Sequence, residues 1–282
     1  MRSEALGNRC PLELGLIGDV QLTLQAVLPK VLQNPEREHL DTALKDYKKA
    51  REDLDALAES GPGSSIIHPQ YLNRLVNELA DEDAIFTCDV GTPTAWAARY
   101  LKMNGKRRLI GSFNHGSMAN AMLQAIGAQA TFPDRQVISM SGDGGFTMMM
   151  GDFLTLNQVG LPVKVIVLNN GTLGFVEMEM KAAGFPDVGC ELNNPNFAAM
   201  AEAMGVKGIR VEHPGELEAA LREALSHDGP VLVDVVSARQ ELVMPPSKTF
   251  EQAKGFSLFM LKTVMDGRAR ELIDLAKVNL FR

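Results

Sequence analysis

Two short loops, each behind an apolar run, constrain what this chain can fold into. The first loop is Gly142–Gly145 (Gly-Asp-Gly-Gly) after the apolar run Val137–Met140, and the second is Asn169–Asn170 after Val163–Leu168. Between the two loops, Met148–Gln158 has helical composition. Because the loops of a strand–helix–strand unit share one edge of a parallel sheet, we expect both loops to meet there. The stretch therefore predicts a doubly wound α/β fold with a ligand site at that edge.

Asp143 and Asn170 are the candidate metal ligands of this site. Carboxylate and amide oxygens suit Mg²⁺, a hard cation that shares its oxygen ligands between protein, water and phosphate. Gly144 and Gly145 let the backbone amides approach a diphosphate. A Gly-Asp-Gly turn alone is more typical of a ligand-free loop, so the prediction depends on the second loop at the right spacing.

The Gly-Asp-Gly loop followed by paired asparagines resembles the signature of thiamine diphosphate-dependent enzymes. The segment Leu173–Met180 narrows the resemblance to the pyruvate oxidases and quinone-dependent pyruvate dehydrogenases, and the resemblance covers nearly the whole chain. It implies Mg²⁺ held by Asp143, Asn170 and a backbone carbonyl near Thr172. The cofactor-binding residues that it implies are Gly116, Ser117, Met118, Asp143, Gly144, Gly145, Asn170, Gly171, Thr172, Leu173, Gly174, Phe175 and Val176.

Met118 ends a loop of small residues, Gly111–Met118, before an alanine-rich helix expected at Ala119–Ala130. In the resembled family, an apolar side chain at the position of Met118 wedges beneath thiamine diphosphate. The carbonyl at the position of Gly116 accepts a hydrogen bond from the 4′-amino group of the cofactor. A methionine at the start of a helix is otherwise typical of core packing.

The resemblance also implies a reaction: oxidative decarboxylation of pyruvate to acetate and CO₂, with electrons passing through FAD to ubiquinone. Phe175 matches a residue between thiamine and flavin, and Glu179 matches an acidic side chain near the reaction centre, so both are candidate catalytic residues. The family needs a further glutamate, which comes from the N-terminal domain of another subunit, and no residue of this chain matches it. The chain thus resembles the C-terminal half of such an enzyme, expected as a homo-oligomer or with a partner that carries the N-terminal domain.

The pattern along the chain predicts four segments. Residues 1–32 resemble the end of a central, Rossmann-like FAD-binding domain, with a strand at Leu14–Val20 and a helix at Val20–Leu32. Residues 33–66 are a linker helix and loop, residues 67–240 form the thiamine diphosphate- and Mg²⁺-binding domain, and residues 241–282 form a membrane-binding segment. By the resemblance, Arg2 and Asp19 lie where the central domain approaches the flavin, although Asp19 is equally typical of a helix N-cap.

Further elements of the main domain follow from composition. The loop Asp89–Pro93 either approaches a phosphate or is a plain turn, and the basic residues between Arg99 and Arg108 indicate a solvated face. Helices are expected at His68–Leu79, Phe197–Met204 and Glu216–Leu225, and strands at Ala84–Cys88 and Val231–Val236.

The tail begins where Val243–Pro246 interrupts regular structure. Gly255–Leu261 is strongly apolar, and the residues from Lys248 onward include seven basic and four acidic side chains, a net charge of +3 in a chain of net charge −7. Such a segment can lie in the membrane interface, or it can dock as a helix on its own domain. In the resembled enzymes the matching tail binds lipid, which implies anionic membrane lipid as a partner.

The acidic net charge argues against nucleic acid as a partner, because phosphate binding needs clustered Lys and Arg. The three cysteines are odd in number and far apart, which favours a reducing compartment. No run of about eighteen apolar residues and no apolar leader is present. We therefore expect a cytoplasmic protein, peripheral on the inner face of the cell membrane.

Two other functions stay open at this level. One is an acetolactate synthase-like carboligase, against which Phe175 and the tail after Met244 argue. The other is a non-catalytic cofactor- or lipid-binding remnant of a larger enzyme.

Overall fold

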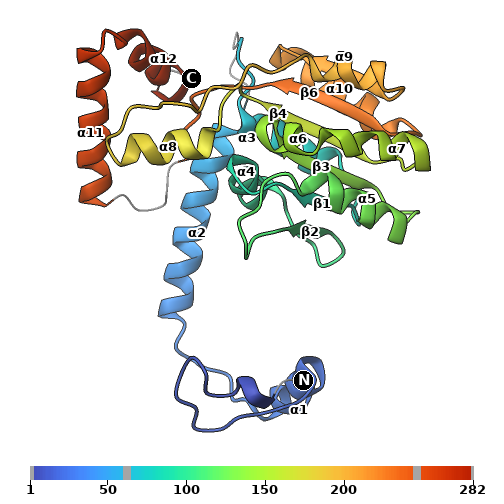
Figure 1. Ribbon diagram of the computed structural model, residues 1–282. Coiled ribbons are helices and arrows are strands. Elements are labelled where there is room, and N and C mark those ends of the chain that lie inside the picture. The colour runs from blue at the N-terminus through green and yellow to red at the C-terminus, as the bar shows by residue number, and fades with distance from the viewer. Residues whose placement is uncertain (1–2, 60–64, 244–248, 281–282) are drawn as a thin grey trace. The chain divides into compact units, whose positions relative to one another are not determined.

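A computed structural model describes residues 3–59, 65–243 and 249–280 (Figure 1). The chain divides into two compact units, Met1–Glu52 and Asp53–Arg282. Helix α2, Glu38–Leu57, crosses the boundary between them. Arg2, which the resemblance places near a flavin, lies outside the described residues.

The first unit is helical where it is regular. It contains the 3₁₀ turns η1 (Ser3–Ala5) and η2 (Leu28–Lys30) and the helix α1 (Val20–Val27), whose N-cap Asp19 accepts a hydrogen bond from the Leu22 amide over 2.9 Å. The prediction of a strand at Leu14–Val20 is wrong. The described residues of this unit contain no strand that could pair with the backbone groups of this segment. None of residues 4–52 has a buried side chain, so the described part of this unit has no core of its own.

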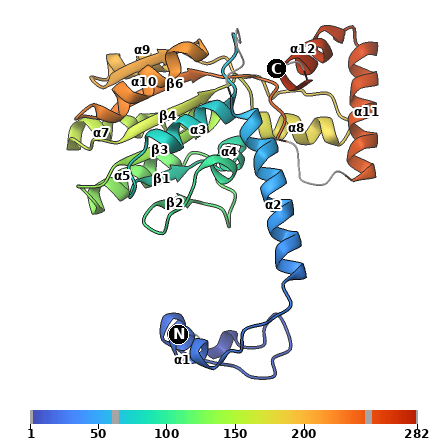
Figure 2. The same cartoon turned by 180° about the vertical axis from the view of Figure 1, so that it is seen from behind.

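The second unit is built on a six-stranded, all-parallel sheet in the order β2-β1-β3-β4-β6-β5 (Figure 2). The strands are β1 (Ile85–Cys88), β2 (Arg108–Gly111), β3 (Val137–Gly142), β4 (Lys164–Asn169), β5 (Lys207–Val211) and β6 (Val231–Val236). The expected α/β fold with a parallel sheet is therefore confirmed, and the four expected strands are β1, β3, β4 and β6. The sequence did not predict β2 and β5, because each lies at an edge of the sheet and its partly exposed residues interrupt the apolar pattern.

Helices cover both faces of the sheet (Figures 1 and 2). One face packs against α3 (Pro69–Leu79), α4 (Thr92–Tyr100) and α10 (Pro214–Ser226), and the other against α5 (Ala121–Thr131), α6 (Asp143–Met148), α7 (Phe153–Val159) and α9 (Phe197–Ala203). Each face has its own buried apolar cluster, and successive residues of a strand alternate between the two clusters. On the second face, Phe146 makes edge-to-face contacts with Phe153 and Phe197, at centroid distances of 5.8 Å and 5.5 Å.

The helix expected at Met148–Gln158 is interrupted. Helix α6 begins at Asp143 and ends at Met148, the 3₁₀ turn η3 occupies Met150–Asp152, and α7 starts at Phe153. An acidic residue in the first turn favours a helix start at Asp143, because it faces the positive end of the helix dipole. The Gly-Asp-Gly loop is thus the first turn of a short helix.

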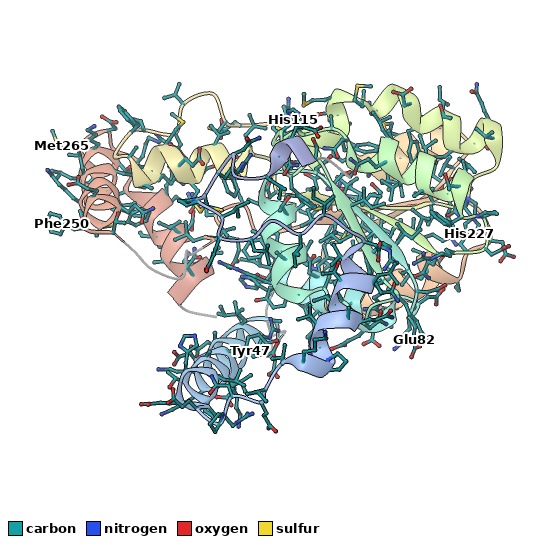
Figure 3. The ribbon with its side chains drawn as sticks, turned by 90° about the horizontal axis from the view of Figure 1, so that it is seen from below. Tyr47, Glu82, His115, His227, Phe250 and Met265 are labelled. Carbon is teal, nitrogen blue, oxygen red and sulfur yellow. The ribbon has the colours of Figure 1, made fainter. Side chains whose placement is uncertain are left out.

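Besides α9 and α10, the described chain has three helices after the second loop. They are α8 (Gly174–Ala182), α11 (Phe250–Met265) and α12 (Ala269–Leu280). Helices α8 and α11 touch through their backbones, since a Cβ atom on Gly255 would lie only 2.0 Å from the carbonyl oxygen of Ala182. Phe259 is buried against this contact, whereas Phe250 and Met265 lie on the outer side of α11 (Figure 3). In the part of the chain that the structure describes, no helix is both long and apolar enough to cross a membrane.

Candidate functional site

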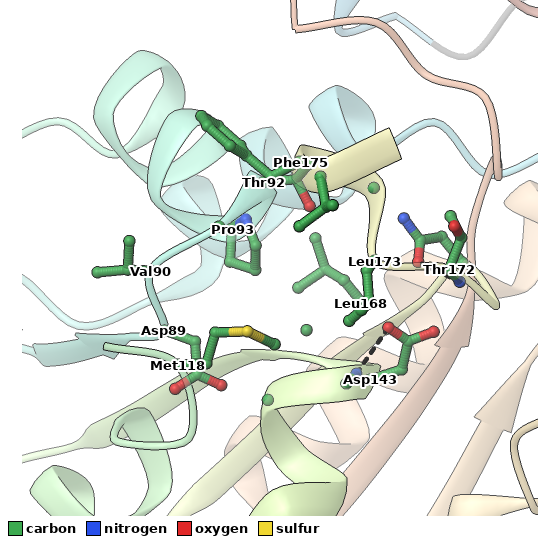
Figure 4. A pocket seen from close by; sticks show the side chains of 17 residues that line it. Asp89, Val90, Thr92, Pro93, Met118, Asp143, Leu168, Thr172, Leu173 and Phe175 are labelled. Carbon is green, nitrogen blue, oxygen red and sulfur yellow. Dashed lines mark hydrogen bonds between the residues drawn. The ribbon is translucent and has the colours of Figure 1, made fainter. Parts of the chain in front are cut away.

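A cavity opens where β1, β3 and β4 end, at the carboxyl edge of the sheet (Figure 4). Its volume is about 60 Å³, far below the roughly 300 Å³ of a pocket that encloses a whole organic ligand. The residues that line it are Asp89, Val90, Gly91, Thr92, Pro93, Met118, Gly142, Asp143, Gly144, Gly145, Leu168, Asn170, Thr172, Leu173, Gly174, Phe175 and Val176. They come from the loops that follow β1, β3 and β4 and from the loop that contains Met118.

Asp143 is the buried carboxylate of this cavity. Its Oδ1 accepts a hydrogen bond from the Gly144 amide over 2.8 Å (Figure 4), and its Oδ2 accepts one from the Gly171 amide over 2.7 Å. The side-chain amide of Asn194 is a third donor, 2.7 Å from Oδ2. Burial raises the pKa of Asp143, and these hydrogen bonds oppose that effect. A carboxylate has about four lone-pair positions, so Oδ1 keeps one for a ligand.

Asn170 and Thr172 follow β4 on the same rim. The side-chain oxygen of Asn170 accepts a hydrogen bond from the Thr172 amide over 3.2 Å, and the carbonyl of Thr172 accepts one from the Gly174 amide over 2.9 Å. Each oxygen therefore keeps one free lone pair. The three oxygens of Asp143, Asn170 and Thr172 are hard donors of the kind that Mg²⁺ prefers.

The glycines of the first loop are required by close packing. A Cβ atom on Gly144 would lie 2.8 Å from Leu173 Cδ2 and 3.4 Å from Met118 Cε, and one on Gly145 would lie 2.4 Å from Asp89 Oδ2. A side chain at either position would therefore collide with its neighbours. The oxygens of Asp143, Asn170 and Thr172 are the groups that fit a magnesium diphosphate at this edge.

Met118 approaches the cavity from the side opposite Asp143 (Figure 4). The residue after it, Ala119, has a φ of 63°, which is uncommon for a residue with a side chain. Asp89 holds the turn, because its Oδ1 accepts hydrogen bonds from the amides of Asn120 and Ala121, both over 2.8 Å. Burial raises the pKa of Asp89, and these two amides oppose that effect. The geometry therefore fixes Met118 against the loops of β1 and β3.

Sequence reasoning missed Asn194. Besides its bond to Asp143, its side-chain amide donates to Asn169 Oδ1 over 2.9 Å, and Asn169 in turn donates to Asp234 Oδ1 over 2.9 Å. Asn194 lies in an irregular segment before α9, where neither periodicity nor a motif distinguishes it from the neighbouring asparagines. The loop Asp89–Pro93, considered only as a possible phosphate loop or plain turn, also lines the cavity.

The other candidate residues are placed as follows. Phe175 and Val176 line the cavity at the start of α8, with exposed fractions of 37% and 45%, whereas Gly116, Ser117 and Gly171 lie on its loops without lining it. Glu179 is exposed and lines a separate cavity of about 630 Å³ between α8 and α11, which also includes Phe175. Phe175 is thus shared by both cavities.

Several known proteins have sequences similar to this chain. YdaP of Bacillus subtilis (strain 168), which is named for thiamine pyrophosphate, is 35% identical over 96% of this chain and 47% of its own length. The acetolactate synthase large subunit of Lactococcus lactis subsp. lactis (strain IL1403) is 32% identical over 85% of this chain and 41% of its own length. The chloroplastic acetolactate synthase of Arabidopsis thaliana is 34% identical over 84% of this chain and 37% of its own length. The chain thus spans less than half the length of these relatives.

The family profile described as thiamine pyrophosphate enzyme, C-terminal TPP binding domain, matches residues 89–235. This range runs from the end of β1 through β6 and includes the whole rim of the cavity. It also includes Met118, Asp143 and Asn170. The chain therefore belongs to the thiamine pyrophosphate enzyme family, of which it carries the C-terminal TPP-binding domain.

Proposed function

We propose that the cavity at the carboxyl edge of the sheet binds thiamine diphosphate through Mg²⁺. Asp143 Oδ1, Asn170 Oδ1 and the Thr172 carbonyl hold the metal. The backbone of Gly144 and Gly145 borders the diphosphate, and the Gly144 amide is itself held by Asp143 Oδ1. The observation that carries the proposal is that Asp143, Asn170 and Thr172 all line one cavity. Met118, fixed by Asp89 from the other side, supports the thiazolium and pyrimidine rings, and the Gly116 carbonyl accepts a hydrogen bond from the pyrimidine amino group.

When bound, thiamine diphosphate supplies the carbanion that attacks the carbonyl of a 2-oxo acid. The chain's own residues bind and orient it. Asp143 and the loop of Thr172 fix the diphosphate end, and Leu173 and Phe175 provide apolar surface that excludes water from the ring end. Glu179 lies farther along α8, where its exposed carboxylate lines the neighbouring cavity and can accept a proton near the substrate.

For the complete reaction, we propose oxidative decarboxylation of pyruvate to acetate and CO₂, with FAD and then ubiquinone as electron acceptors. The segment Leu173–Met180 and the cationic tail support this choice. Because the chain spans less than half of its relatives, we propose that it acts as the C-terminal half of such an enzyme. We propose that the chain forms a homo-oligomer or binds a partner with the N-terminal domain, and only such a partner supplies the activating glutamate. Residues 1–32 are what the chain carries of the FAD-binding domain.

The second candidate is an acetolactate synthase-like carboligase. The names of several relatives favour it. Both candidates share the metal site, and they differ in the fate of the two carbons that remain after CO₂ is lost.

Calorimetric titration of the full chain with Mg²⁺ and thiamine diphosphate tests the shared part of the proposal. Asp143→Ala removes a carboxylate ligand beside the diphosphate charge, whereas Asp134→Ala changes an exposed carboxylate on a turn outside the cavity. We expect Asp143→Ala to weaken binding at least tenfold and Asp134→Ala to leave it unchanged. Equal affinities of the two variants would contradict the proposed metal site.

The reaction class is tested with pyruvate. The purified 282-residue chain alone should not turn over pyruvate, because none of its residues matches the activating glutamate. After addition of the N-terminal part of YdaP, reduction of a soluble ubiquinone analogue supports the oxidoreductase, and acetolactate without quinone reduction supports the carboligase. Turnover by the chain alone would contradict the proposed division of the site.

We also propose that α11 and α12 bind anionic lipid and keep the protein at the inner face of the cell membrane. The support is the tail's net positive charge and the exposed apolar side of α11, where the exposed fractions of Leu261, Val264 and Met265 are 59%, 52% and 77%. The exposed Phe250 lies at the start of the same helix (Figure 3).

A further inference from the structure

A chain of paired charges joins the proposed metal loop to the C-terminal helices. The Thr172 hydroxyl donates to Glu177 Oε2 over 2.5 Å, and Glu177 Oε1 is paired with the ammonium of Lys181. Lys181 Nζ lies 3.6 Å from Asp187 Oδ2, and Asp187 Oδ1 accepts a hydrogen bond from Arg268 Nη2 over 2.6 Å. Arg268 lies between α11 and α12. The chain thus runs from the cavity rim to the tail.

The middle of this series of paired charges is buried. The side chains of Glu177, Lys181 and Asp187 are only 4%, 3% and 5% exposed. Removing charges from water costs several kcal/mol per ion unless they are paired. Two carboxylates and one ammonium leave one negative charge, which faces Arg268 from the tail. Arg268 shares its positive charge between Asp187 and Glu271, which lies 2.5 Å from its Nε. Without Arg268, the buried group of Glu177, Lys181 and Asp187 holds an uncompensated negative charge.

Two other tail residues hold the same segment. Phe259, 1% exposed, places its ring centroid 5.3 Å from Lys181 Nζ and so covers the buried ion pair. Lys262 donates a hydrogen bond to the Gly184 carbonyl over 2.8 Å. Together with Arg268, these residues fix both ends of the stretch between Lys181 and Asp187.

At the cavity end, the charge chain acts on Thr172, whose carbonyl is a proposed metal ligand. Its hydroxyl lies 2.5 Å from Glu177 Oε2 and 3.1 Å from the Cys190 carbonyl oxygen, and the residue is 2% exposed. The Leu173 amide also donates to the Cys190 carbonyl over 2.8 Å. Glu177 is thus one of two groups that hold the Thr172 side chain, and Glu177 is itself paired with Lys181.

We propose that Arg268 and Phe259 are positioning residues, which act through Asp187, Lys181 and Glu177 to hold the Thr172 loop in its metal-binding conformation. This inference rests on the proposed metal site. Because coupling between two sites is reciprocal, Mg²⁺–thiamine diphosphate binding and docking of α11–α12 stabilise each other by the same factor. The tail is then part of the cofactor site without touching the cofactor.

The test compares Arg268→Gln with Arg270→Gln in the full chain, since Arg270 is an exposed arginine of the same region. Titration calorimetry with Mg²⁺ and thiamine diphosphate should give about tenfold weaker binding for Arg268→Gln, within the usual range of such couplings, and no change for Arg270→Gln. Arg268→Lys keeps the charge and should recover most of the affinity. If circular dichroism shows that Arg268→Gln is unfolded, Phe259→Leu takes its place in the same titration.

Hydrogen exchange separates coupling from a merely structural role. In the parent chain, Mg²⁺ with thiamine diphosphate should slow amide exchange in α11–α12, and in Arg268→Gln this added protection should be lost. Equal affinities of the two glutamine variants, or cofactor-independent exchange in α11–α12, would overturn the inference. If the parent chain binds no cofactor at all, the proposed metal site fails and the inference fails with it.

Discussion

The side-chain amide of Asn194 donates a hydrogen bond to Asp143 Oδ2 over 2.7 Å and thereby fixes the plane of that carboxylate. Because Asn169 Oδ1 accepts the second hydrogen of the same amide, Asn194 is itself held in one orientation. The consequence is that Oδ1 of Asp143, which faces the cavity loop, keeps its free lone pair in a constant direction. Partners of this kind commonly tune metal affinity.

Asn194→Ala should weaken Mg²⁺-dependent binding of thiamine diphosphate by about tenfold to a hundredfold, the usual effect of removing such a partner. The matched control is Asn193→Ala, which removes an exposed asparagine. The measurement is titration calorimetry at fixed thiamine diphosphate and varied Mg²⁺. An unchanged magnesium affinity would show that the two amides at Gly144 and Gly171 orient Asp143 without help.

The aromatic cluster beneath α6 should be a large contributor to stability. Phe146 is 2% exposed and contacts the rings of Phe153 and Phe197, so Phe146→Ala should lower the free energy of unfolding by about 3–5 kcal/mol. Phe250→Ala, at a side chain 81% exposed, should change it by less than about 0.5 kcal/mol. Urea unfolding followed by circular dichroism gives both values, and similar values for the two variants would contradict the packing argument.

Lys164 should make stability depend on pH. It is 4% exposed, its ammonium donates to the carbonyls of His227 and Gly229, and burial lowers its pKa from 10.5 to about 8. Between these two values the unfolded chain binds a proton that the folded chain lacks, so stability should rise with pH from about 8 toward 10.5. Lys164→Met should reduce that rise. Identical pH profiles of the parent and Lys164→Met in urea unfolding would exclude this role.

The lipid proposal predicts an effect confined to the outer side of α11. Met265→Ser should reduce co-sedimentation with anionic vesicles by about tenfold, because the methionine loses the burial of its side chain in the interface. Val159→Ser, at a residue 62% exposed on the main domain, should have no effect. If docking of α11–α12 is coupled to the metal site, Mg²⁺ with thiamine diphosphate should also weaken vesicle binding. Equal sedimentation of both variants would show that the tail only caps its own domain.

The sequence predicted the central sheet well, and the reason is physical. Strands β3, β4 and β6 are buried on both faces, so their residues form continuous apolar runs. Edge strand β5 contains Lys207, Gly208 and Arg210 and has no such run. The segment Leu14–Val20 has the apolar content of a strand, but a strand also requires a neighbour, which a local pattern cannot provide.

For the site, the spacing of the two loops was enough to bring Asp143 and Asn170 to one rim. It was not enough to find Asn194 or the charges that connect Thr172 to Arg268, because these contacts depend on irregular segments and on helix packing. A side chain in such a segment has no periodicity that indicates which way it points. Its role becomes visible only when its hydrogen-bond partners are known.

The strand order also determines when the cavity can form during synthesis and folding. Its rim comes from β1, β3 and β4, and β4 gains its second neighbour only with β6, which ends at Val236. These pairings close long stretches of chain, whose entropy opposes early contact. The sheet that carries the rim is therefore complete on both sides of β4 only after nearly the whole domain has left the ribosome. A bound cofactor cannot speed those early steps, and its kinetic effect is to slow the opening of the finished sheet.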